Sequence, residues 1–195
     1  MQPARGIGNG IGRCRRRAGE ALGCGGTVIG QVAEAGEVFS SSAIRAELAL
    51  GDVKGAAQML GWWWRVAGVV SSGAKRGTGL GFPTANIALP PGTALAHGIY
   101  AVRIRMGSRN YAGAAYLGTR PTFDDGAAIL ETFLFDFDGD LYGREIEVEF
   151  IDFIRPDRRF DSAAALQTQM DQDCGRAREI LARAGTRPPG GGTAA

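Results

Sequence analysis

Short runs of alternating apolar and polar residues, joined by turns, constrain the fold of this chain most. Residues 99–106 alternate in this way, Gly107-Ser108 predicts a tight turn, and residues 109–117 return as the partner strand. The runs 130–135 and 145–150 have the same strand character. Because no helical pattern separates these runs, we expect consecutive strands to pair in an antiparallel sheet or barrel.

Helical patterns flank the predicted strands. Residues 162–184 predict a helix that Asp161 or Ser162 can cap, with one apolar stripe made by Leu166, Met170, Cys174, Ala177 and Leu181. Before the strands, a capping serine in Ser40-Ser-Ser predicts a short helix whose apolar contacts are Ile44, Leu48 and Leu50.

Three consecutive tryptophans open the run 62–70, which we interpret as the first strand. A row of tryptophans could stack on nucleic-acid bases. Large aromatic side chains more often dominate core contacts, so we expect burial at the entrance of the strand.

Length and charge exclude several classes of protein. The 195 residues suffice for one good-sized domain, and the hydrophobic content of 45% with 22% charged residues is ordinary for a globular chain. The formal net charge is only +2, which argues against broad electrostatic binding of nucleic acid. No run of eighteen apolar residues predicts a membrane span.

Cysteine and histidine are too few for several kinds of site. Cys14, Cys24 and Cys174 lack the paired spacing of a zinc site, and their odd number argues against a closed disulfide framework. A reducing, cytoplasmic setting fits them best. His97 is the only histidine and precedes a predicted strand, so we interpret it as a turn residue.

Changes in composition divide the chain into four regions. Arginine and glycine dominate residues 1–26, which carry too little apolar surface to order themselves and are predicted to be disordered. A short helical segment and linker follow at 27–60, the strands and the last helix occupy 61–184, and residues 185–195 form a loose Pro/Gly-rich tail.

A glycine-rich stretch before residue 87 is the strongest candidate for chemistry. Gly77, Gly79 and Gly81 permit close backbone approaches. Lys75 precedes them and can meet phosphate. Thr84 and Asn86 follow two residues apart, so an extended backbone puts both on one face. Their oxygen atoms, together with phosphate oxygens, suit Mg²⁺. From the spacing alone, an ordinary structural loop remains an equal alternative.

This stretch resembles the signature of riboflavin kinases, in which a glycine-rich loop leads into Pro-Thr-Ala-Asn. Other segments resemble family motifs in the same order, namely Tyr116-Leu-Gly-Thr-Arg-Pro-Thr-Phe123, Leu130-Glu-Thr-Phe-Leu-Phe-Asp-Phe137, Asp140-Leu-Tyr-Gly143 and Phe153-Ile-Arg-Pro156. The resemblance covers roughly residues 62–183. It implies a six-stranded Greek-key barrel that converts riboflavin and ATP to FMN and ADP with Mg²⁺.

The resemblance also implies roles for individual residues. The loop with Lys75 and its three glycines would cover the ATP phosphates, and Thr84 and Asn86 would support the metal ion. Glu131 matches the catalytic glutamate, which accepts the proton of the ribityl hydroxyl. Without the resemblance, a lone glutamate on a strand is more often the solvent-facing half of an alternation. Arg155 would contact the flavin or the nucleotide, or else hold a neighbouring carboxylate.

The segment Phe39-Ser-Ser-Ser-Ala-Ile-Arg45 resembles the last motif of the adenylyltransferase module that precedes the kinase in bifunctional bacterial enzymes. The rest of that module has no counterpart in the chain. We therefore expect a remnant or truncated form in which adenylyl transfer does not occur.

Several positions depart from the family pattern. Bacterial members usually carry histidine, an acid and arginine in place of Ser72, Ala74 and Thr78, and histidine in place of Phe133. Because catalysis here depends on placement, these changes could leave a catalytically weak or inactive flavin- or nucleotide-binding module. A barrel that binds nucleic acid through its basic first 26 residues is a third hypothesis.

The acids of Asp136-Phe-Asp-Gly-Asp140 and Glu147 imitate the spacing of a calcium-binding loop. Leu141 stands where that loop needs glycine, so calcium binding is not expected. We interpret Asp138-Gly139 as a hairpin turn between two strands.

Overall fold

A computed structural model describes residues 33–34, 37–38, 40–71, 84–90, 92–119 and 128–189. The segment 1–26 and the glycine-rich stretch 75–81, for which disorder and phosphate binding were predicted, lie outside the described residues. The chain divides into two units between Ser40 and Ser41. In the first unit, β1 (Ala33–Glu34) and β2 (Glu37–Val38) pair in antiparallel fashion.

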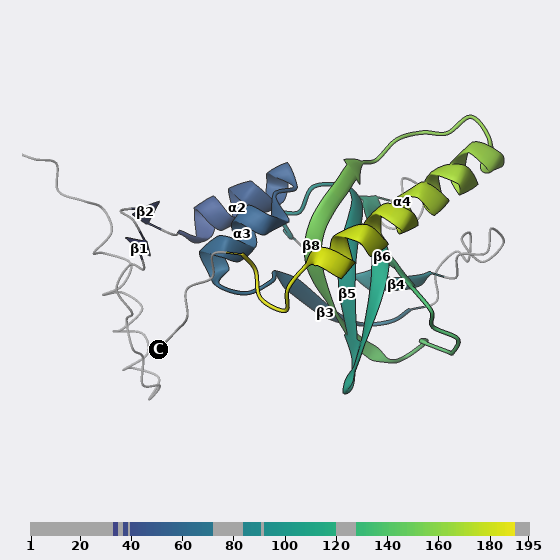
Figure 1. Cartoon of the computed structure of the whole chain (residues 1–195), viewed down its shortest axis with the longest axis horizontal. Coiled ribbons are helices and arrows are strands. Elements are labelled where there is room, and N and C mark those ends of the chain that lie inside the picture. Colours follow the sequence, from purple (N-terminus) through teal and green to yellow (C-terminus); the bar gives the residue numbers. More distant parts are fainter. Residues whose placement is uncertain are drawn as a thin grey trace, which may run out of the picture. The chain divides into compact units, whose positions relative to one another are not determined.

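Six antiparallel strands of the second unit form a nearly closed barrel (Figure 1). In the order of their pairing, the strands are β3 (Arg65–Val69), β8 (Glu145–Pro156), β5 (Gly98–Met106), β6 (Arg109–Thr119), β7 (Ala128–Leu134) and β4 (Ala85–Ala88). Just beyond the end of the edge strand β3, a bridge reaches the other edge strand β4, where the Ser71 amide donates to the Asn86 carbonyl at 2.9 Å. The predicted mainly β barrel is therefore confirmed.

Alternation along each strand fills the inside of the barrel. Tyr100, Val102 and Ile104 of β5 are fully buried, and they meet Val148 and Phe150 of β8 in the same core. The predicted turn joins β5 to β6, with Gly107 at φ 58°, a left-handed conformation that glycine adopts without strain. Because successive side chains of a strand point to opposite faces, the apolar residues form a continuous core inside the barrel.

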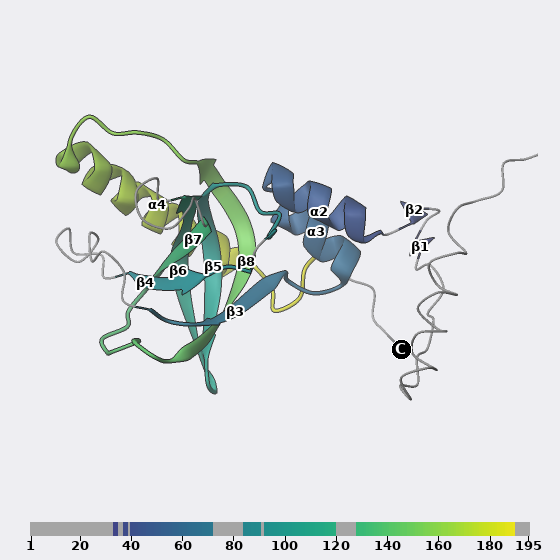
Figure 2. The same ribbon diagram turned by 180° about the vertical axis from the view of Figure 1, so that it is seen from behind.

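Two short helices close one side of the core (Figure 2). They are α2 (Ser41–Leu50) and α3 (Val53–Leu60), and the Asp52 carboxylate caps α3 by accepting from the Gly55 amide at 2.8 Å. Leu48 and Val53 are 3% and 1% exposed and belong to the barrel core. The expected burial of Leu50 was wrong: the last residue of α2 points its side chain outward and is 77% exposed.

The long helix α4 (Ala163–Arg183) lies across strands β5, β6 and β8. It crosses the front of the barrel in Figure 1 and lies behind it in Figure 2. Ser162 caps it, since its Oγ accepts from the Ala165 amide at 3.1 Å. Cys174 and Ala177 of the predicted stripe are buried against the barrel. No described helix is long and apolar enough to span a membrane.

One further expectation was wrong, and another was confirmed only in part. Asp138-Gly139 does not form a hairpin turn, because β7 pairs with β6 and β4 whereas β8 pairs with β5 and β3. The segment between β7 and β8 therefore crosses from one part of the barrel to another. All three tryptophans precede β3. Trp63 is buried and Trp64 packs against the core, as expected, but Trp62 is 55% exposed.

Strand β8 is also longer than predicted. It runs to Pro156 instead of ending near Phe150, because residues 152–156 continue to pair with β5. Register shifts at Ile99/Tyr100 and Ala101/Val102 break the alternation in this pairing. The extension carries Arg155 to the end of the barrel that α4 covers.

Candidate active site

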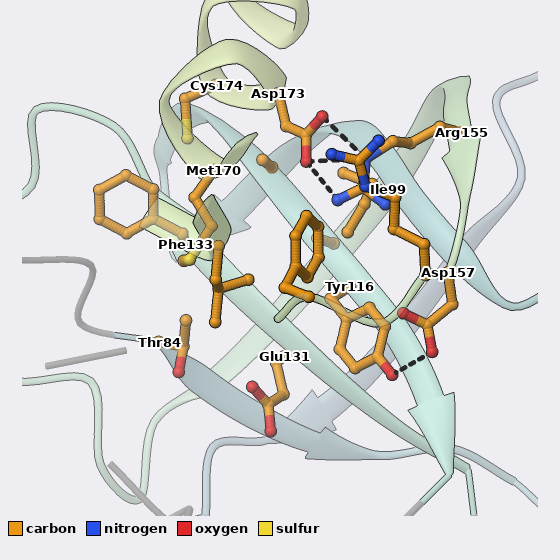
Figure 3. Close-up of a pocket in the computed structure, with 15 residues that line it drawn as sticks. Thr84, Ile99, Tyr116, Glu131, Phe133, Arg155, Asp157, Met170, Asp173 and Cys174 are labelled. Atoms are coloured by element: carbon orange, nitrogen blue, oxygen red, sulfur yellow. Dashed lines mark hydrogen bonds and ion pairs between the residues drawn. The ribbon is translucent and has the colours of Figure 1, made fainter. Parts of the chain in front are cut away.

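A pocket of about 420 Å³ lies between the barrel and α4 (Figure 3). Its lining combines an apolar wall with carboxylates and guanidinium groups. The lining residues are Thr84, Ile99, Ala114, Ala115, Tyr116, Glu131, Phe133, Arg155, Asp157, Arg158, Phe160, Leu166, Met170, Asp173 and Cys174. We call this cavity the helix pocket. Its volume lies in the range of about 300–1,000 Å³ that is usual for small-molecule sites.

One cross-strand row runs along the polar side of the helix pocket, and all of its members except Asn86 line the cavity. Asn86 of β4 lies opposite Glu131 of β7, Glu131 opposite Tyr116 of β6, Tyr116 opposite Ile99 of β5, and Ile99 opposite Arg155 of β8. Directly opposite residues of antiparallel strands project to the same face. Residues separated by up to 69 positions of sequence are thereby brought to one face by strand register alone.

Thr84 and Glu131 line the same pocket, and Figure 3 shows them near one another at its lower edge. Asn86 lies opposite Glu131 in the β4–β7 pairing but is 4% exposed and does not line the pocket. The hydroxyl and amide oxygens of Thr84 and Asn86 are the hard donors that Mg²⁺ takes alongside substrate phosphates. Their chemistry therefore fits the predicted metal ion.

Arg155 holds a neighbouring carboxylate. Its Nη2 donates to Asp173 Oδ2 at 2.7 Å, and its Nε donates to both Asp173 oxygens at 3.0 and 3.1 Å. Gln169 Nε2 donates to Asp173 Oδ1 at 2.9 Å, and Arg155 Nη1 donates to the Pro156 carbonyl at 3.0 Å. This network joins the end of β8 to α4, and it leaves Arg155 two N–H groups for a ligand.

Tyr116 and Asp157 close the pocket near Glu131. The Tyr116 hydroxyl donates to Asp157 Oδ2 at 3.0 Å. Burial, this hydrogen bond and the charges of Asp157 and Glu131 raise the pKa of Tyr116 to about 12. Gly118 leaves room for the ring, because a Cβ there would lie 2.1 Å from the tyrosine oxygen. Tyr116 is therefore a hydrogen-bond donor at neutral pH.

An apolar wall adjoins the cross-strand row in the helix pocket. Phe133 of β7 faces Met170 and Cys174 of α4 (Figure 3). Burial raises the pKa of the Cys174 thiol to about 11, so the thiol remains protonated at neutral pH. A flat apolar ring can lie against this wall while polar atoms face the row on the barrel.

The sequence prediction covered only part of the helix pocket. Thr84, Glu131 and Arg155 all line it, whereas Lys75, Gly77, Gly79 and Gly81 lie outside the described residues. Sequence reasoning gave no role to four polar residues that line it, Tyr116, Asp157, Arg158 and Asp173. Two of them left a signal, since Tyr116 begins a segment that resembles a family motif and Asp173 stands beside the apolar stripe of the predicted helix.

Comparisons with known proteins match this architecture. Residues 60–181 match the family model described as Flavokinase: Riboflavin kinase. The bifunctional riboflavin kinase/FMN adenylyltransferase of Listeria monocytogenes is 34% identical over 149 residues, which cover 75% of this chain and 48% of that protein. The protein of the same name from Haemophilus influenzae is 41% identical over 136 residues, covering 69% of this chain and 44% of the relative.

A solved structure described as a macrolide-efflux protein from Streptococcus pneumoniae is also similar. It is 33% identical with a TM-score of 0.69, and the match covers 80% of this chain and 51% of that one. This chain thus spans about half the length of the curated relatives it matches.

Proposed function

Because this chain belongs to the riboflavin kinase family, we propose that it transfers the γ-phosphoryl group of ATP to the 5′-hydroxyl of riboflavin, giving FMN and ADP. The observation that carries this proposal is the position of Glu131. It lies in one pocket with Thr84 and faces an apolar wall that suits a flavin ring.

Glu131 accepts the proton of the attacking hydroxyl. A bond forms between the ribityl oxygen and the γ-phosphorus, the bond from that phosphorus to the β–γ bridging oxygen breaks, and ADP leaves. A bound Mg²⁺ would neutralise charge on the phosphates. Thr84 and Asn86 are the residues that would hold it, and Lys75 with Gly77, Gly79 and Gly81 would cover the phosphates.

The helix pocket orients the flavin in this proposal. The ring lies against the apolar wall made by Phe133 and Met170, and the remaining N–H groups of Arg155 meet its polar edge. Asp173 fixes the plane of the guanidinium through three hydrogen bonds. Binding therefore places the ribityl chain toward Glu131, where orientation contributes much of the rate.

The proposal concerns phosphoryl transfer alone, because the matching family model is the kinase model over residues 60–181. The relatives are also named as FMN adenylyltransferases, but the match to the kinase model gives no ground for proposing that second activity. We also propose a cytoplasmic setting, which the odd number of cysteines in the sequence favours.

The decisive test compares Glu131→Gln with Glu145→Gln, which removes an exposed carboxylate at the start of β8. Each protein is incubated with riboflavin and MgATP, and FMN is measured. We expect Glu131→Gln to lower kcat by about 10²- to 10⁴-fold, the usual contribution of a general base. Glu145→Gln should keep the activity of the unmodified chain.

Equal FMN formation by Glu131→Gln and the unmodified chain would remove Glu131 from this role. If the proteins quench riboflavin fluorescence but none of them forms FMN, the chain is a flavin-binding module and not a kinase.

A further inference from the structure

A second cavity, of about 490 Å³, shares no lining residue with the helix pocket. It is bounded by α3, β8, the C-terminal end of α4 and the residues that follow this helix. Its lining consists of Lys54, Trp63, Ile151, Asp152, Arg176, Ile180, Arg183, Ala184, Gly185, Arg187 and Pro189. We call it the basic cavity.

Positive charge predominates around the basic cavity. Four cationic side chains line it, from Lys54, Arg176, Arg183 and Arg187, against the single carboxylate of Asp152. Lys54 forms an ion pair with Asp152, which neutralises both. Within the described part of the chain, Arg183 and Arg187 have no ion-pair partner. Two guanidinium groups are therefore available to an anion at this cavity.

The floor of the basic cavity is apolar and contains an unsatisfied donor. Trp63 and Ile151 are 3% and 0% exposed and pack with Ile180. Among the described residues, the indole N–H of Trp63 has no hydrogen-bond acceptor. Because the indole nitrogen itself is buried from solvent, a ligand in the open cavity meets the apolar surface of the floor and not this N–H group.

The backbone beneath the cations is fixed in place. Arg103 of β5 donates through Nη2 to the carbonyls of Ala184 and Gly185, at 2.6 and 2.8 Å. Carbonyls at the C-terminal end of a helix carry partial negative charge, which would repel an anion. Arg103 offsets that charge and holds the turn between Arg183 and Arg187. The two guanidinium groups are thus presented from an anchored segment.

We propose that the basic cavity is a second binding site, distinct from the kinase pocket, for a small phosphate-bearing anion held by Arg183 and Arg187. Guanidinium groups bind phosphate oxygens through paired hydrogen bonds, which gives them an advantage over a single ammonium group. The apolar floor at Trp63 and Ile151 can accept a ring attached to the phosphate. Inorganic pyrophosphate and ADP share the required chemistry.

The test titrates the full chain with inorganic pyrophosphate and follows tryptophan fluorescence, because Trp63 lines the cavity. Arg183→Gln and Arg187→Gln are compared with Arg109→Gln, which removes the same charge from the exposed β5–β6 hairpin. We expect either cavity variant to raise the Kd by about 10-fold, as expected for the loss of a charge-assisted contact, and Arg109→Gln to leave it unchanged. The KM for ATP should stay the same in all three variants.

Two further arms separate the basic cavity from the kinase site and identify the ligand. Lys75→Gln removes a cation from the predicted phosphate loop, and we expect it to keep the pyrophosphate response that depends on Arg183. A titration with ADP in the Lys75→Gln protein distinguishes the two sources of phosphate. Tighter binding of ADP than of pyrophosphate assigns the cavity to nucleotides, and the reverse order assigns it to inorganic phosphates.

The proposal is overturned if millimolar pyrophosphate gives no saturable response, or if Arg109→Gln weakens binding as much as the cavity variants. It also fails if Arg183→Gln lowers thermal stability and leaves the Kd unchanged, since Arg183 then only complements the end of α4. These outcomes do not depend on FMN formation, so they remain readable if the kinase proposal fails.

Discussion

Tyr116 shows how a single residue can shape the site although the sequence motif that it begins does not indicate its role. It lies between two carboxylates, opposite Glu131 in the sheet and hydrogen-bonded to Asp157 beyond β8. Its raised pKa of about 12 keeps the phenol protonated, so the hydroxyl donates to Asp157 throughout the neutral range. Tyr116 therefore connects β6, which pairs with the strand of Glu131, to the segment after β8 that bounds the pocket near Arg155.

Tyr116→Phe should loosen that connection without removing a group that reacts. We expect the KM for riboflavin to rise about 3- to 10-fold, the usual effect of one lost hydrogen bond, with kcat within about 2-fold. Steady-state kinetics at pH 7 provides the measurement. Tyr111→Phe is the matched control, because this tyrosine of the same strand packs against Phe137 outside the helix pocket.

A fall in kcat at constant KM would show that Tyr116 acts on the reacting groups and does not position the flavin. Equal kinetics for Tyr116→Phe and the unmodified chain would show that the Asp157 contact has no part in binding.

At the scale of elements, α4 is attached to the barrel by one buried ion pair and an apolar stripe. The side chains of Arg155 and Asp173 are only 17% and 7% exposed, and Asp173 accepts from Gln169 as well. The pair Arg176–Glu179 on the same helix has a similar separation of 3.1 Å, but both side chains are more than half exposed. The buried pair should contribute more to stability than the exposed pair, because water screens the charges of Arg176 and Glu179.

Asp173→Asn should therefore destabilise the protein far more than Glu179→Gln. Removing one charge leaves the buried Arg155 without its counter-ion, and we expect a loss of about 3 kcal/mol in the free energy of unfolding. Glu179→Gln should cost less than about 0.5 kcal/mol. Urea unfolding followed by far-UV circular dichroism measures both values. Equal losses would mean that the apolar stripe alone anchors α4.

At the scale of the whole molecule, local pattern predicted the elements better than their pairing. Residue alternation predicted β5 and β6, and the three-to-four spacing of apolar residues predicted α4. The hairpin predicted at Asp138-Gly139 was wrong because a crossover in a Greek-key barrel depends on distant partners. No local feature of the sequence distinguishes such a crossover from a turn between neighbours.

The candidate site shows the same difference between local pattern, which the sequence reveals, and long-range pairing, which it does not. The sequence singled out Glu131 and Thr84 separately. Thr84 directly precedes β4, and the pairing of β4 with the strand of Glu131 brings both residues to one pocket. Asp157 and Asp173 gain their importance only when the end of β8 and the helix α4 meet. Such contacts join segments that are far apart in the sequence, so residue spacing carries little trace of them.

The last prediction concerns α2 and α3, and it asks whether these helices unfold together with the strands as one cooperative unit. Leu48 is buried in the barrel core, and its carbonyl accepts from the Ala96 amide at 2.9 Å. Leu50 lies two residues away on the same helix and is exposed. We expect Leu48→Ala to cost about 2–4 kcal/mol and Leu50→Ala less than about 0.5 kcal/mol in one shared unfolding transition.

Unfolding followed by near-UV circular dichroism, which reports the packed aromatic pair Tyr100–Phe150, measures both changes. If Leu48→Ala leaves the barrel transition unchanged and produces a separate, earlier transition of helical signal, α2 and α3 are an independent appendage. A single transition shifted only by Leu48→Ala would mean that the barrel core includes residues that precede its first strand. The folding unit would then begin at or before α2, upstream of the segment 60–181 that matches the kinase family.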